Sequence, residues 1–83
     1  MSLNQELLQF VRSELAPGGD AASIDEQTQL IDSGVIDSMA LMRLIAFVEE
    51  RAAVRIPDED VVPDNFQSIN DIRSLVDRLK ARR

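Results

Sequence analysis

The sequence predicts an all-α fold, a small four-helix bundle with three main helices, one short helix and a long first loop. Apolar residues recur at helical spacing in three separate stretches. Capping and helix-breaking residues stand at the ends of these stretches. No alternating run of apolar and polar residues is bounded by turn signals, as a strand would be. We expect residues 1–83 to form one domain, close to the lower size limit for a self-supporting core.

The first helix is predicted over residues 3–15. Its apolar side chains follow helical spacing, and they are Leu3, Leu7, Leu8, Val11 and Leu15. Ser2 is suited to cap the helix, and Gln5 follows three residues later as in a capping box. The Pro-Gly-Gly sequence at 17–19 is expected to end the helix.

Residues 16–36 form a connection of about twenty residues, a length that is uncommon in a compact domain and often functional. The connection is acidic and contains no basic residue. Its apolar residues are expected to anchor it, with Leu30 and Ile36 as the main anchors. The full set is Ile24, Leu30, Ile31, Val35 and Ile36.

The second helix is predicted over residues 38–52. Its expected buried stripe consists of Leu41, Leu44, Ile45 and Val48. Pro57 disfavours helical geometry at Ile56, so the chain leaves the helix before that point. Residues 58–67 are expected to hold a short helical turn at most.

The last helix is predicted to begin after Ser68, which would cap it, with Asp71 three residues later as a capping-box acid. The helix is expected to end near Lys80. Its apolar face is regular, and it consists of Ile69, Ile72, Leu75, Val76 and Leu79.

Composition excludes several classes of function. The chain has neither cysteine nor histidine, so thiolate metal sites and the commonest general base are absent, and we predict no metal site. The net charge of −6 argues against nucleic acid as a partner, because such binding depends on basic contacts to phosphates. No apolar run approaches the ~20 residues of a membrane span. The first residues lack the features of a signal peptide, so a cytoplasmic protein is expected.

Ser38 opens the second helix beside Asp37, and a serine in such a place is ordinarily a cap. Asp37 can be the cap instead, which would leave the Ser38 hydroxyl free in the first turn. A phosphate ester on that hydroxyl would lie at the positive end of the helix dipole. Direct catalysis by Ser38 lacks an activating base in this chain. We therefore expect a protein that is not an enzyme.

The stretch Leu30-Ile31-Asp32-Ser33-Gly34-Val35-Ile36-Asp37-Ser38-Met39 resembles the attachment site of acyl carrier proteins. The similarity continues through residues 49–51, 56–60, 63–66 and 68–69, and so covers roughly the whole chain. The resemblance implies that a phosphopantetheinyl transferase attaches 4′-phosphopantetheine from coenzyme A to Ser38, and that Asp37 helps to position the metal and coenzyme A in the transferase complex. The terminal thiol of the arm would carry an acyl or aminoacyl group as a thioester. The fold implied is the bundle of acyl-carrier-protein type.

The resemblance also implies that the exposed side of the second helix contacts partner enzymes. These are the transferase, a loading ligase and downstream transferases. Carried over by position, this partner surface consists of Met39, Ala40, Met42, Arg43, Ala46, Glu49 and Glu50. Core packing is a nearly even alternative for Met42. Members of fatty acid synthesis usually carry acids where this chain has Ala40 and Arg43, so a dedicated biosynthetic pathway is expected.

The cargo stays open between fatty acyl, polyketide and amino acid groups. Asp37 stands where most peptidyl carrier domains have histidine, yet free-standing aminoacyl carriers also show Asp-Ser-Met. The arm or cargo is expected to lie against the bundle near Leu41, Ile45, Ile56 and Phe66, and a monomer is the simplest state. The alternative is a helical protein–protein interaction domain with no prosthetic group, in which Ser38 is only a helix cap.

Overall fold

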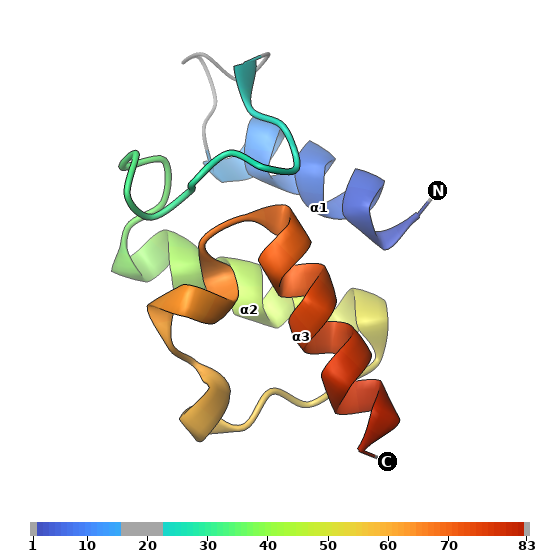
Figure 1. Ribbon diagram of the computed structural model, residues 1–83. Coiled ribbons are helices and arrows are strands. Elements are labelled where there is room, and N and C mark those ends of the chain that lie inside the picture. Colours follow the sequence, from blue (N-terminus) through green and yellow to red (C-terminus); the bar gives the residue numbers. More distant parts are fainter. Residues whose placement is uncertain (1, 16–22, 83) are drawn as a thin grey trace.

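The computed structural model describes residues 2–15 and 23–82. Helix α1 (Leu3–Phe10) continues into a π-helical turn, η1 (Val11–Leu15), and is followed by α2 (Ser38–Ala52), the 3₁₀ turns η3 (Asp58–Asp60) and η4 (Pro63–Phe66), and α3 (Ile69–Ala81) (Figure 1). The described residues contain no strand. The all-α class is confirmed, and two 3₁₀ turns stand where one short helix was expected.

The first helix begins as predicted. The Gln5 N–H donates to Ser2 Oγ at 3.2 Å, and the Ser2 N–H donates to Gln5 Oε1 at 3.1 Å, which completes the capping box. The helical stretch spans residues 3–15, but its last five residues form the wider π turn. The predicted stop at residues 17–19 lies outside the described residues.

The other two helices also have the expected limits. Helix α2 is followed by its C-terminal cap Ala53, which adopts a left-handed conformation with φ of 55° and donates its N–H to the Glu49 carbonyl. At the start of α3, Ser68 Oγ accepts the Asp71 N–H at 3.2 Å and donates to Asp71 Oδ2 at 2.9 Å. Ser68 is thus the cap of α3. In a full capping box the acid would accept the backbone N–H of the serine, whereas here the Asp71 carboxylate accepts the serine hydroxyl.

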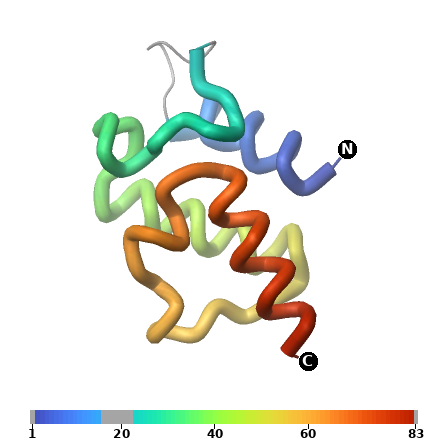
Figure 2. The backbone as a smooth tube through the Cα atoms, in the orientation of Figure 1, coloured from blue at the N-terminus to red at the C-terminus, as the bar shows by residue number. Residues whose placement is uncertain are grey.

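The core lies where α1 packs against α2 and α3. Figure 2 shows α1 above the other two helices and the 53–62 segment running beneath them. Three of the four residues of the predicted α2 stripe are buried, and Leu41 is half-buried. All five apolar residues of the predicted α3 face are buried: Ile69, Ile72, Leu75, Val76 and Leu79. Phe66 has no exposed surface and belongs to the core cluster, so it attaches η4 to the helices.

The described part of the long loop, residues 23–36, is anchored as predicted. Ile24, Leu30 and Ile36 are buried, and Ile31 and Val35 are half-buried against the core. Backbone bonds add to this anchoring, because the Leu30 N–H donates to the Gln67 carbonyl at 2.6 Å. The Asn70 N–H donates to the Glu26 carbonyl at 3.1 Å.

Asp25 stabilises a tight turn in the same loop. Its carboxylate accepts the Gln27 N–H at 2.8 Å and the Thr28 hydroxyl at 3.1 Å. The Gln27 and Thr28 hydrogen bonds lower the pKa of Asp25 below its ordinary value. The loop is therefore held by local polar contacts as well as by its apolar anchors.

Candidate prosthetic-group attachment site

A tight turn brings the chain to the start of α2. The Ser33 N–H donates to the Gln29 carbonyl at 3.0 Å, and the Gly34 N–H donates to the Ile31 carbonyl at 3.1 Å. Gly34 has φ of 81°, a conformation that other L-residues rarely adopt. The turn is followed by buried Ile36, which fixes the entry of the chain into the helix.

Replacing Gly34 by alanine is expected to cost about 1–2 kcal/mol of unfolding free energy. A Cβ atom there would meet no heavy atom within 4 Å, so the cost is conformational and not a clash. Gly34→Asn should lose less unfolding free energy than Gly34→Ala, because asparagine tolerates left-handed geometry. Urea unfolding of the two variants measures the difference, and equal losses would contradict this explanation.

Asp37 is the cap of α2. It has extended backbone geometry, and its Oδ1 accepts the Ala40 N–H at 2.9 Å. The sequence left the cap open between Asp37 and Ser38, and the structure shows Asp37 in that role. Ser38 is the first residue of the helix and is exposed. Ser38 is therefore not the helix cap, because Asp37 has that role.

The surroundings of Ser38 suit an attached phosphate. Among the hydrogen bonds of the described residues, none uses the Ser38 hydroxyl. The first N–H groups of a helix have no partner within the helix and favour a negative group. Here the Ala40 and Leu41 N–H groups are bonded to Asp37, at 2.9 and 2.8 Å, and the two N–H groups before them lie at the open helix end. A phosphodiester on Ser38 would therefore meet a favourable dipole and no competing hydrogen bond.

Gln67 connects this site to η4. Its side chain exchanges two long hydrogen bonds with Asp32, each 3.4 Å, through the Asp32 N–H and Oδ1. The Gln67 carbonyl also accepts the Leu30 N–H. The turn before Ser38 is therefore attached to η4, and no pattern in the sequence indicated this role of Gln67.

The predicted partner surface on α2 is largely exposed. Met39 is 79% exposed and Met42 is 64% exposed, so the core alternative for Met42 is wrong. Arg43, Ala46 and Glu50 are exposed, and Ala40 is half-buried. Val62, 42% exposed, is a further apolar side chain on the surface, and it was not among the predicted residues. It had no helical periodicity to identify it.

Two charged residues of this surface have structural contacts. Arg43 Nη1 lies 3.5 Å from the Glu14 carbonyl, so its charge is directed toward the end of η1. Glu49 is half-buried, and its Oε2 accepts the Ile56 N–H at 2.9 Å. Glu49 therefore attaches the segment after α2 back onto that helix.

A groove of about 980 Å³ runs between α2 and the segment that follows it. Its lining residues are Met42, Ile45, Glu49, Val54, Arg55, Ile56, Pro57, Asp58 and Val61. Ile45 lies seven residues after Ser38, about 10 Å along the helix axis at 1.5 Å per residue. Of the four residues expected beside the arm, Ile45 and Ile56 line this groove. Phe66 lies in the core instead, because its ring has no exposed surface.

Comparison with known families matches residues 5–79 to the model described as "Phosphopantetheine attachment site". The chain belongs to this family. The family's prosthetic group is covalent 4′-phosphopantetheine, and its carrier members work with modifying and biosynthetic enzymes. A carrier role in biosynthesis follows from this membership together with the relatives below.

Two carrier relatives span most of this chain. "Probable acyl carrier protein PigG" of Serratia sp. is 29% identical over 95% of this chain and 90% of its own length. "Aminoacyl carrier protein 1" of Bradyrhizobium diazoefficiens is 28% identical over 89% of this chain and 81% of its own length. Among solved structures, a chain in "Crystal structure of FAD-dependent dehydrogenase" matches with a TM-score of 0.78 and 27% identity, over 86% of this chain and 99% of that chain. No helix among the described residues of this carrier protein is long and apolar enough to cross a membrane.

Proposed function

We propose that Ser38 is the residue that bears 4′-phosphopantetheine. The observation that carries this proposal is the exposed Ser38 hydroxyl, which stands at the start of α2 without a hydrogen bond because Asp37 caps the helix. The attached group supplies a terminal thiol, on which an acyl or aminoacyl group is held as a thioester. The chain itself supplies the serine oxygen, the favourable helix terminus and the surface that partner enzymes contact. It performs no catalysis of its own.

Asp37 has two separable roles in this proposal. Its carboxylate oxygen caps α2, and its negative charge assists the transferase by helping to place the metal and coenzyme A. Asp37→Asn should keep the cap and remove the charge, whereas Asp37→Ala removes both. We expect Asp37→Ala to lose about 1 kcal/mol of unfolding free energy and Asp37→Asn to lose little.

The rate of phosphopantetheinyl transfer tests the second role of Asp37. Both variants should be modified about tenfold more slowly, which corresponds to about 1.4 kcal/mol in the activation barrier. The transfer rate is measured by intact mass over time, and stability is measured by urea unfolding. If Asp37→Asn is modified at the rate of the original protein, Asp37 acts only as a cap.

The partner surface is proposed to be the exposed side of α2 together with Val62. Met39 and Met42 provide adaptable apolar contacts that several enzymes can use in turn. This chain has Ala40 and Arg43 where carriers of fatty acid synthesis usually have acids. Binding to a uniformly basic surface of a partner enzyme is therefore disfavoured. The partners proposed are a phosphopantetheinyl transferase, a loading ligase and downstream transferases of a dedicated pathway. The likeness to a chain in a structure of an FAD-dependent dehydrogenase supports testing flavin dehydrogenases as well.

The cargo is proposed to be a specialised acyl or aminoacyl group, as the names of the two carrier relatives support. The groove beside α2 is proposed to receive the end of the arm. Its lining supports small or polar cargo, because Glu49, Arg55 and Asp58 stand among the apolar residues. A monomeric state and a cytoplasmic location stay predictions.

The experiment that tests this function begins with the intact mass of the protein after incubation with coenzyme A, magnesium and a broad-specificity transferase. We expect a gain of one phosphopantetheinyl group. The modified protein is then offered amino acids and short acyl groups with candidate ligases. If the folded protein gains no mass with two different transferases, the carrier function is wrong, and a protein–protein interaction domain without a prosthetic group replaces it.

A further inference from the structure

The two walls of the groove beside α2 are attached to different helices. One wall is attached to α2 itself, through the 2.9 Å bond between the Ile56 N–H and Glu49 Oε2. The other wall includes η3 and Val61. Turn η3 contains no buried residue, and Val61 is half-buried. The position of this second wall therefore depends on polar contacts as well as on the packing of Val61 against the core.

Those polar contacts come from α3. Arg82 Nη2 pairs with Asp60 Oδ2 at 3.3 Å, and Arg78 Nη2 donates to Asn65 Oδ1 at 3.0 Å. Asn65 Nδ2 in turn donates to the Asp60 carbonyl at 2.8 Å. These four residues, Asp60, Asn65, Arg78 and Arg82, form one connected network, which we call the latch. It joins the last two turns of α3 to η3 and η4.

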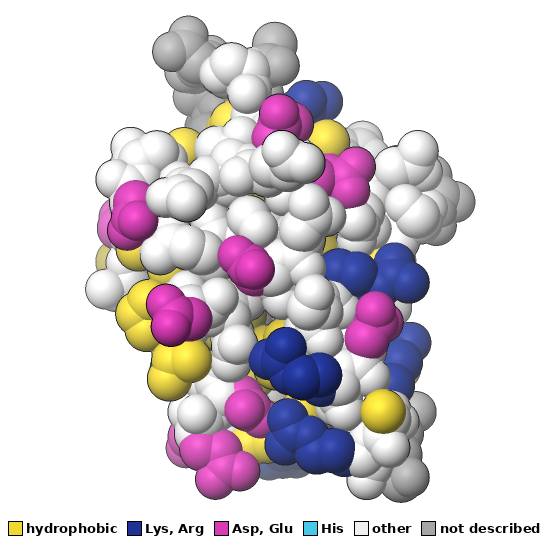
Figure 3. Space-filling model, in the orientation of Figure 1, with side chains coloured by type: hydrophobic (Ala, Val, Ile, Leu, Met, Phe, Trp, Pro, Cys, Tyr) yellow, Lys and Arg dark blue, Asp and Glu magenta, His cyan; other side chains and the backbone are white. Residues whose placement is uncertain are grey.

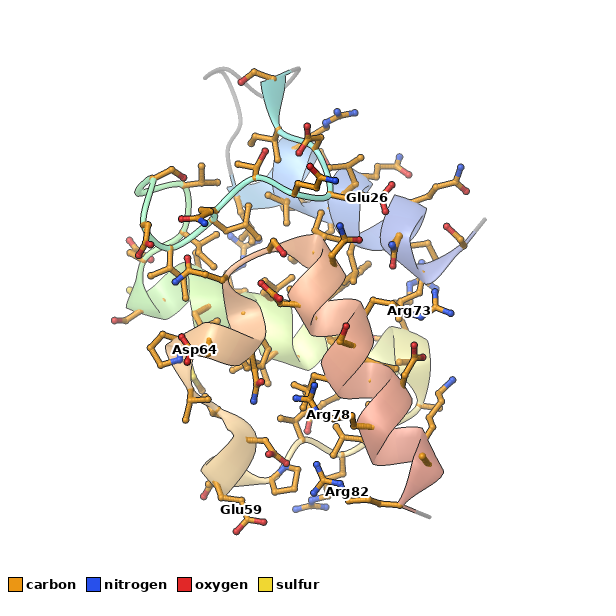
Figure 4. All side chains as sticks on the ribbon, viewed as in Figure 1. Glu26, Glu59, Asp64, Arg73, Arg78 and Arg82 are labelled. Carbon is orange, nitrogen blue, oxygen red and sulfur yellow. The ribbon has the colours of Figure 1, made fainter. Side chains whose placement is uncertain are left out.

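The figures show the same arrangement. Arg78 and Arg82 extend from α3 toward the segment that carries Glu59, whereas Arg73 points to the other side of the helix (Figure 4). In the space-filling view, basic side chains gather over the C-terminal half of α3, with acidic side chains next to them (Figure 3). The Asp60 side chain is only 19% exposed, so its carboxylate is more shielded from solvent than the Arg82 side chain, which is 52% exposed.

We propose that the latch sets the width of the groove and thereby the size of the cargo that the groove shelters. This inference rests on the proposed function, in which the end of the arm lies in the groove. With the first wall held by Glu49, a change in width requires η3 to move away from α2. Such a movement breaks the Asp60 contacts, so Arg78 and Arg82 act as positioning residues for cargo selection.

The latch is weak enough to open. Ion pairs and polar contacts at exposed side chains contribute little, so removing one is expected to raise the population of the open groove about two- to fivefold. A wall that is released from α3 also loses support for its own turn, so the amides of Asp60, Val61 and Val62 report the release. Their N–H groups are bonded to the carbonyls of Pro57, Asp58 and Asp60, within the wall that moves.

The first measurement is amide hydrogen exchange in the full chain without a prosthetic group. In Arg82→Gln, the amides of residues 60–62 should exchange about two- to fivefold faster than in the original protein. In the double variant Arg78→Gln/Arg82→Gln, they should exchange about tenfold faster. Arg82→Lys should restore most of the protection, since it keeps the charge beside Asp60. Arg73→Gln is the matched control, because it removes the 3.1 Å pair with Asp77 on the same helix without touching the wall. Unchanged exchange in the double variant, or equal acceleration in Arg73→Gln, would overturn the latch.

The second measurement is thioester hydrolysis on the loaded protein, with acetyl and octanoyl groups as probes. In the original protein the acetyl thioester should hydrolyse more slowly than the octanoyl thioester. In the double variant the ratio of the two hydrolysis rates should move toward one, while Arg73→Gln should keep the original ratio. If the protein is never modified by a transferase, the proposed function fails, while hydrogen exchange still decides the latch. If it is modified and the ratio is the same in the double variant, the proposed control of cargo size is wrong.

Discussion

Ser38→Ala is expected to remove phosphopantetheinylation completely, with no gain in intact mass under conditions that modify the original protein fully. The reason is chemical, since alanine offers no oxygen to form the phosphoester. The fold should be unaffected. Asp37 and not Ser38 caps α2, and no hydrogen bond of the described residues uses the Ser38 hydroxyl. The unfolding free energy should therefore change by less than about 0.5 kcal/mol.

Ser33→Ala is the matched control for this experiment. Ser33 is exposed in the same loop, and its backbone N–H bond to Gln29 does not need the side chain. This variant should be modified at the original rate. Retained modification of Ser38→Ala would show that another residue bears the group, and a large loss of stability would show that Ser38 has a structural role.

The second large effect is expected from Leu30→Ala, which should lower the unfolding free energy by about 2–5 kcal/mol. Leu30 has no exposed surface and anchors the loop that leads to Ser38. A domain of this size has a total stability of about 4–12 kcal/mol, so the loss is a large share of it. Urea unfolding measures the change, and the rate of phosphopantetheinyl transfer shows whether the loop still presents Ser38.

Two further variants separate the explanations for Leu30. Leu30→Met keeps the volume and should cost less than about 1.5 kcal/mol. Ile31→Ala, at the half-buried neighbour, should cost less than Leu30→Ala. If Leu30→Ala and Ile31→Ala lose the same unfolding free energy, the loop is not anchored through Leu30.

The sequence was sufficient to predict the features that depend on neighbouring residues. Periodicity located α2 at residues 38–52, and the pair Asp37-Ser38 limited the cap to two adjacent residues, of which the structure shows Asp37 to be the cap. Ser2 and Ser68 were identified as caps for the same reason, because the cap bond reaches only three residues along the chain. Phe10 is partly buried and stacks on Phe47 of α2, with ring centroids 4.2 Å apart, a contact between helices that the sequence did not indicate.

Features that depend on distant pairs could not be predicted. The bond of Glu49 to the Ile56 N–H turns a residue expected on the partner surface into a support for the groove. The contacts of Gln67 with Asp32, and of Arg82 with Asp60, join positions whose side chains have no common periodicity. The π turn at the end of the first helix was also missed, because five residues of wider winding leave the apolar pattern almost unchanged.

The backbone bonds that anchor the loop have a consequence for the order of maturation. The Leu30 N–H needs the Gln67 carbonyl, and the Glu26 carbonyl receives the Asn70 N–H. Both bonds join the loop before Ser38 to residues near the beginning of α3. Contacts between such distant positions form late in folding, since closing a long stretch of chain costs entropy first. During synthesis, a ribosome-bound chain therefore has its serine in an unfinished loop until α3 has emerged, and a transferase that requires the ordered loop acts only after translation has passed that helix.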